Sequence, residues 1–145
     1  MVSEFSRQLG RDLAKATIPI GKAKVAVDGF HKGNDCVTLV EAWAHVGSAK
    51  SAQRNKVLGD ILKLALVTAA LKRSSPTLKV ESYIVFADSA AANVLNGRGW
   101  ASLAANEFGI TARILLLPDE VVETIKEAQR KQDIRITDDC DAETA

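Results

Sequence analysis

Apolar positions along the chain switch between helical and strand spacing. Apolar residues at every fourth position from Phe5 to Leu13 predict a helix over 3–16. Pro19 and Gly21 then interrupt the pattern. Two mostly apolar runs follow, at 24–30 and 36–46, with the polar segment 31–35 between them. This arrangement predicts a hairpin of two strands inside a sheet that is covered on both faces.

Further along the chain, helical and strand patterns alternate. A wide apolar stripe predicts a largely buried helix over 51–72. The later elements, in chain order, are a strand at 79–87, helices at 89–95 and 101–108, a strand at 113–117 and an amphipathic helix at 119–131. This order predicts an α/β fold with a mixed central sheet flanked by helices. We expect one domain over 1–132, followed by an acidic, disordered tail over 133–145.

Composition and charge narrow the class of protein. The chain has 145 residues, enough for one domain with a core of its own. There is no apolar run of about 18 residues and no secretion signal at the start, so we expect a cytoplasmic protein without a membrane partner. Cys36 and Cys140 have no metal-ligand spacing, and we expect no disulfide between them.

The net charge of +1 hides an asymmetry between the two parts of the chain. Residues 1–80 hold 13 basic and 6 acidic residues, a net charge of +7. Residues 81–145 hold 6 basic and 12 acidic residues, a net charge of −6. The basic part is compatible with binding to the phosphates of a nucleic acid.

Candidate chemistry lies on the predicted hairpin. Glu41 stands in the middle of an apolar strand, where an ionised carboxylate is costly unless a cation or a hydrogen-bond donor pairs with it. Strand alternation places Trp43 and His45 on the same face as Glu41. We expect the hairpin to bring Asp28 of the first strand near Glu41. Two convergent carboxylates suit Mg²⁺ or Mn²⁺.

These residues resemble the PD-(D/E)XK nuclease superfamily. That superfamily carries an Asp on one strand of a hairpin, Glu/Asp-x-Lys on the next, and a following helix that often has a Gln near its start. Asp28, Glu41 and Gln53 match these positions, and the resemblance covers about residues 1–90. It implies a restriction-endonuclease-like α-β-β-β-α-β core. It also implies Mg²⁺-dependent hydrolysis of DNA phosphodiesters, with Asp28 and Glu41 as metal ligands.

The chain departs from the family at the motif lysine, which is replaced by Trp43. Some members supply this lysine from the following helix, and Lys56 is then the matching residue, one turn after Gln53. His45 is a second basic candidate for the same part. Nearby basic residues would contact phosphates without reading bases: Lys22, Lys24, Lys32, Lys50 and Arg54. Glu4 is a candidate outer-shell carboxylate.

Other interpretations stand beside the nuclease hypothesis. The chain is alternatively an inactive nuclease fold that binds nucleic acid or protein, or an unrelated α/β domain for a small molecule. Asp28 before Gly29 is also typical of a turn. Glu41 is alternatively a structural acid paired with Lys56 or Arg54. A homodimer is a further expectation.

Simpler interpretations also apply to the remaining candidates. Gln53 and Lys56 are alternatively an ordinary helix start, and His45 a surface residue at a strand end. Packing is the simpler interpretation for Trp43. The segment 96–100 is either a basic and aromatic contact loop or a helix C-cap that anchors Trp100 in the core.

Overall fold

The computed structural model describes residues 1–143, with side chains to residue 134. The helices are α1 (Val2–Leu9), α2 (Ser51–Ser74), α3 (Ser89–Asn96), α4 (Trp100–Glu107) and α5 (Asp119–Glu143). The strands are β1 (Ala14–Ile20), β2 (Ala23–Lys32), β3 (Cys36–Trp43), β4 (Lys79–Phe86) and β5 (Ile110–Ile114). The mixed α/β fold predicted from the sequence is confirmed at this level.

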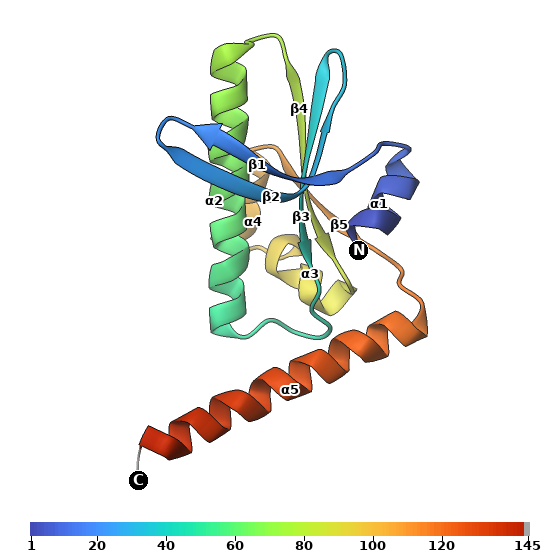
Figure 1. The fold of residues 1–145 in the computed structure, drawn as a ribbon, viewed down its shortest axis with the longest axis vertical. Helices are drawn as coiled ribbons and strands as arrows, with labels where there is room; N and C mark the ends of the chain where they lie inside the picture. Colours follow the sequence, from blue (N-terminus) through green and yellow to red (C-terminus); the bar gives the residue numbers. More distant parts are fainter. Residues whose placement is uncertain (144–145) are drawn as a thin grey trace.

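One five-stranded sheet organises the molecule, with the strands in chain order from β1 to β5 (Figure 1). The pairs β1–β2 and β2–β3 are antiparallel, whereas β3–β4 and β4–β5 are parallel. Helices α2, α3 and α4 cover one face, where Leu64 of α2 packs in the same core cluster as Leu39 of β3. Helix α1 covers the other face, where Phe5 packs with Val40 and Val85.

The start of the chain differs from the expected helix over 3–16. Helix α1 ends at Leu9, because Gly10 adopts a left-handed conformation with φ of 63° that closes the helix. The predicted helix was therefore wrong beyond this point, and strand β1 was missed. In β1 the inward residues alternate, and Ala16, Ile18 and Ile20 all pack against the core. Pro19 is tolerated because β1 is an edge strand.

Strand β2 carries a bulge that bears on the candidate site. Ala14 and Ala16 of β1 pair with Phe30 and Val27, so β2 has one extra residue between these partners. A side chain at Gly29 would put its Cβ 3.1 Å from Val40 Cβ, so the close approach of β2 and β3 favours glycine here. Asp28 lies within this bulge, between Val27 and Phe30.

The C-terminal third of the chain adds β5 and a long helix. Strand β5 spans Ile110–Ile114, earlier than the expected 113–117. Helix α5 crosses one end of the body and continues past the expected end at residue 131 (Figure 1). Gln129 holds it there by accepting from Val46 N–H at 2.8 Å and donating to the Val46 carbonyl at 3.2 Å.

The acidic tail predicted over 133–145 falls mostly outside the described side chains, and residues 144–145 lie outside the described chain. The side chain of Cys140 is among those not described. Across residues 1–143, no helix combines the length and apolarity needed to cross a bilayer.

Candidate functional site

Glu41 is a buried acid on the face of β3 that α2 covers. Its side chain is 5% exposed, and its Oε2 lies 2.8 Å from Lys63 Nζ. Its second oxygen, Oε1, is buried and has no hydrogen-bond partner. Burial raises the pKa of Glu41 to about 7, and the Lys63 ammonium only partly offsets this effect. Ionisation of Glu41 therefore destabilises the folded state.

Asp28 lies on the β2 bulge, next to Gly29, where the paired residues of β2 and β3 end. The Cα pairs of the two strands run from Gly29–Val40 to Lys32–Val37. Beyond Gly29, Asp28 Oδ2 accepts the Ala42 N–H at 3.0 Å. The negative charge of Asp28 contributes to the raised pKa of Glu41, which puts the two carboxylates in one electrostatic environment. The turn interpretation of Asp28 was wrong, because the residue lies inside a strand.

Helix α2 brings a row of charged residues to this site. Lys63 Nζ, besides its contact with Glu41, lies 3.5 Å from Asp60 Oδ1. Asp60 is itself buried, and its Oδ2 lies 3.6 Å from Lys56 Nζ. The basic group in contact with Glu41 is thus Lys63, whereas Lys56 faces Asp60 one turn earlier.

Sequence reasoning missed Lys63 and Asp60 as site residues. The signal was present, because Lys56, Asp60 and Lys63 have the i, i+4, i+7 spacing of one helix face. What the spacing does not show is how far β3 and α2 overlap along their length. That overlap places Glu41 opposite the second half of this row rather than opposite the start of the helix.

Gln53 and His45 lie together at the loop between β3 and α2. Gln53 Oε1 accepts the Lys50 N–H at 2.7 Å and so caps the start of α2. Gln53 Nε2 lies 3.4 Å from His45 Nδ1. The His45 ring stacks on Trp43 with centroids 5.0 Å apart and an interplanar angle of 16°. These contacts organise the loop.

The remaining candidates have their own surroundings. Trp43 is 6% exposed and meets Phe86 edge-on at 5.6 Å, which confirms that it packs in the core. Glu4 on α1 pairs with Arg7 and accepts from Gln8. Trp100 is 69% exposed, so the interpretation that anchored it in the core was wrong. Gly97 does provide the C-cap of α3, as the cap interpretation expected.

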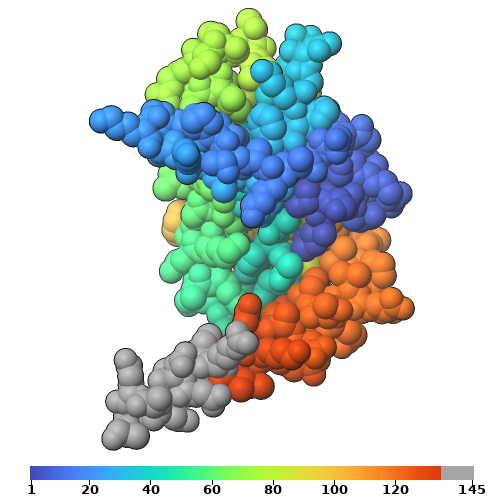
Figure 2. Space-filling view, in the orientation of Figure 1, coloured from blue at the N-terminus to red at the C-terminus, as the bar shows by residue number. Residues whose placement is uncertain are grey.

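Several candidate phosphate contacts are unpaired cations. Among the described side chains, Lys22, Lys24, Lys32 and Arg54 form no ion pair, whereas Lys50 lies 3.7 Å from Asp133. Lys22 and Lys24 belong to the β1–β2 hairpin, which projects beyond the rest of the body (blue, Figure 2).

Two carboxylates are the candidate oxygen donors at this site. The unpartnered Glu41 Oε1 and the nearby Asp28 carboxylate are oxygen donors of the kind that Mg²⁺ prefers. Within the described side chains, no three His, Cys, Asp or Glu residues converge closely enough to enclose an ion. The Mg²⁺ site expected from the sequence therefore stays a prediction, with at most these two carboxylates as protein ligands.

Comparison of the chain with protein-family models, with curated proteins and with solved structures finds no match. The interpretation of the site therefore depends on the residues and their geometry.

Proposed function

We propose that this chain is a divergent PD-(D/E)XK-like protein that hydrolyses DNA phosphodiesters with Mg²⁺. The observation that carries the proposal is the buried Glu41 carboxylate. It has one oxygen on Lys63, one oxygen without a partner, and Asp28 close by. A fold has little reason to retain such a costly group unless the group has a further use.

The order of elements supports the same proposal. The first six elements run α1, β1, β2, β3, α2, β4, an order that matches the α-β-β-β-α-β order expected of a restriction-endonuclease-like core. Asp28 and Glu41 lie on neighbouring antiparallel strands of the sheet, and the helix that follows carries the basic group. Strand β1, which was not expected from the sequence, supplies the third strand of this order.

Each residue then has a role at the site. Asp28 and Glu41 would hold the metal, which when bound supplies a water of lowered pKa and polarises a phosphoryl oxygen. The Lys63 ammonium lies beside Glu41 and is partly exposed, so it can stabilise negative charge that develops on the phosphate. Lys63 would thus take the part of the motif lysine that Trp43 replaces. Lys22 and Lys24 would contact flanking phosphates.

A second candidate function is a binding module with the same fold and no hydrolysis. The observation that favours it is the contact between Lys63 Nζ and Glu41 Oε2, because an ammonium at 2.8 Å already neutralises one of the two carboxylates. Under this alternative, the basic hairpin would still bind nucleic acid, and Glu41 would have a structural part only.

Cleavage of supercoiled plasmid and of single-stranded DNA tests the proposal. We expect the protein to cleave one of them with Mg²⁺ or Mn²⁺ and not with EDTA, and Asp28→Asn to reduce the rate at least about 100-fold. Glu81→Gln is the matched control, because Glu81 is a paired acid on the opposite face of the sheet, and it should leave the rate within about two-fold. DNA binding without cleavage under either metal would favour the binding module.

A further inference from the structure

A pocket lies between α2 and the short helices α3 and α4, and the candidate site does not include it. Its volume is about 490 Å³, within the range of about 300–1,000 Å³ typical of small-molecule sites. The lining residues come from the loop after β3, from α2, and from α3 with the turn into α4. The pocket is therefore built by the segments that follow the C-terminal ends of β3 and β4, where open α/β sheets commonly bind ligands.

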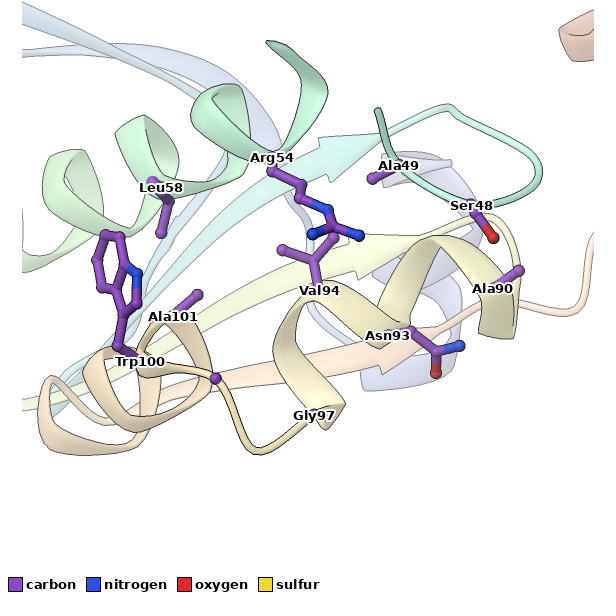
Figure 3. Close-up of a pocket in the computed structure, with 11 residues that line it drawn as sticks. Ser48, Ala49, Arg54, Leu58, Ala90, Asn93, Val94, Gly97, Trp100 and Ala101 are labelled. Carbon is purple, nitrogen blue, oxygen red and sulfur yellow. The ribbon is translucent and has the colours of Figure 1, made fainter. Parts of the chain in front are cut away.

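Trp100 gives this pocket a flat aromatic wall. The indole stands beside Leu58 and Ala101 at one end of the pocket (Figure 3). Its 69% exposure contrasts with the 6% exposure of Trp43, the other tryptophan of the chain. An exposed indole face suits stacking of a planar ring, which contributes about 1–3 kcal/mol per base when proteins bind single strands.

Arg54 gives the pocket its charge. Its guanidinium points into the space between α2 and α3, above Val94 (Figure 3). Arg54 forms no ion pair among the described side chains, and the lining contains no acidic residue. Asn93 and Ser48 at the other end add hydrogen-bonding groups. An aromatic wall, an unpaired guanidinium and neutral polar groups together suit a base attached to a phosphate.

The rim of the pocket favours a chain rather than an isolated small molecule. Gly97 and Gly99 line it on either side of Arg98, and a Cβ at Gly99 would meet no atom within 4 Å. The rim is thus open to solvent at this turn, and Arg98 has no ion-pair partner in the described part of the chain. The strand on either side of a bound nucleotide could therefore extend out of the pocket, with a phosphate beside Arg98.

We propose that the pocket is a nucleotide subsite for single-stranded nucleic acid, in which one base stacks on Trp100 and its phosphate contacts Arg54. The choice of ligand rests on the proposed function. The place of the subsite is separate from the hydrolytic site, because helical spacing puts Arg54 and Leu58 on the flank of α2 opposite Lys56 and Lys63. Changes in the pocket should therefore leave the surroundings of Glu41 intact.

Binding of a fluorescein-labelled oligothymidylate in EDTA, followed by anisotropy, tests the subsite without any cleavage. Trp100→Ala should weaken binding by about 5- to 150-fold, the range expected from loss of one stacked base, and Trp100→Phe should restore most of it. Leu103→Ala is the matched control, because Leu103 is 66% exposed on the same helix and does not line the pocket. It should bind as the wild type does.

The charge is tested in the same assay. Arg54→Ala should weaken binding and reduce the slope of log K against log salt by about 1, as loss of one phosphate contact predicts. Arg73→Ala, a cation at the far end of α2, is its control. The subsite is overturned if Trp100→Ala stays within about two-fold of the wild type, or if the oligonucleotide does not bind.

Titration with thymidine monophosphate separates a strand from a free nucleotide as the source of this chemistry. We expect the monophosphate to bind much more weakly than the oligonucleotide. Equal affinities, with equal losses in Trp100→Ala, would contradict the single-strand assignment. These outcomes are independent of hydrolysis. If the protein cleaves DNA but Trp100→Ala does not weaken oligonucleotide binding, the subsite alone is contradicted. If Trp100→Ala weakens oligonucleotide binding but the protein does not cleave DNA, the nuclease proposal alone is contradicted.

Discussion

Two glutamates on neighbouring strands, Glu41 on β3 and Glu81 on β4, show opposite ways to hold a charge against one sheet. Glu81 lies on the face of α1, is 19% exposed, and pairs with both Arg11 and Lys79. Glu41 lies on the face of α2, is 5% exposed, and leaves one oxygen without a partner. Lys79 and Arg11 lower the pKa of Glu81, whereas burial raises the pKa of Glu41 to about 7.

The difference separates a structural ion pair from a candidate functional group. Glu81 stabilises the fold when it is ionised, because its carboxylate has partners on both oxygens and its side chain is 19% exposed. The Glu41 carboxyl group has a higher pKa in the folded chain than in the unfolded chain, so it holds its proton to a higher pH when folded. Between pH 4.5 and about 7 the folded state therefore binds more protons, and the free energy of unfolding should fall as the pH rises through this range.

Removal of the cation beside Glu41 should be the most destabilising change. Lys63→Met takes away the only ion-pair partner of Glu41 among the described side chains, so its carboxylate becomes still harder to ionise. We expect a loss of about 2 kcal/mol in the free energy of unfolding near pH 8, which shrinks near pH 5, where Glu41 is protonated. Urea unfolding at the two pH values measures it. A loss that is equal at both would show that Lys63 acts by packing instead.

Removal of the paired acid should have a smaller effect with the opposite pH dependence. Glu81→Gln should cost about 1 kcal/mol at neutral pH, because charge-assisted bonds from Arg11 and Lys79 are lost. The pKa of Glu81 is lowered in the folded state, so its contribution is present above the ordinary pKa and is lost as the pH falls through the folded value. Wild type and variant should therefore converge in acid. A difference that grows in acid would contradict this assignment.

A loss of similar size is expected at the strand contact beside Asp28. Gly29→Ala places a methyl group 3.1 Å from Val40 Cβ and 3.2 Å from Val2 Cγ1, so the neighbours must move by a few tenths of an ångström. We expect a loss of about 1 kcal/mol in stability, measured by thermal unfolding. Gly59→Ala, a glycine of α2 with open space around it, is the control and should be neutral or stabilising. Equal effects at the two glycines would argue against a close contact at Gly29.

Much of the fold could be predicted from apolar periodicity, and the failures have physical causes. The hairpin strands and α2 were predicted close to their observed positions, because their apolar patterns are long. Strand β1 was missed because the spacing of Phe5, Leu9 and Leu13 continues a helical pattern past Gly10. The left-handed glycine and the edge position of β1 decide the structure there, and both are tertiary features.

The candidate site was predicted in part for the same reason. An acid inside an apolar strand is visible in the sequence, and so is Asp28 across the hairpin. The partner of Glu41 is not visible, because Lys56 and Lys63 share one helix face and only the relative placement of β3 and α2 selects Lys63. The exposure of Trp100 was equally hidden, since the cap at Gly97 does not determine the direction of the next helix.

The most direct test of the central claim is the free energy of unfolding of Glu41→Gln near pH 8. If the ionised Glu41 destabilises the fold and is retained for function, the neutral side chain of Glu41→Gln should make the protein more stable than the wild type. The gain should be about 1–3 kcal/mol near pH 8 and should disappear near pH 5. A loss of stability near pH 8 similar to that of Glu81→Gln would show that Glu41 is a structural ion pair and would contradict the account.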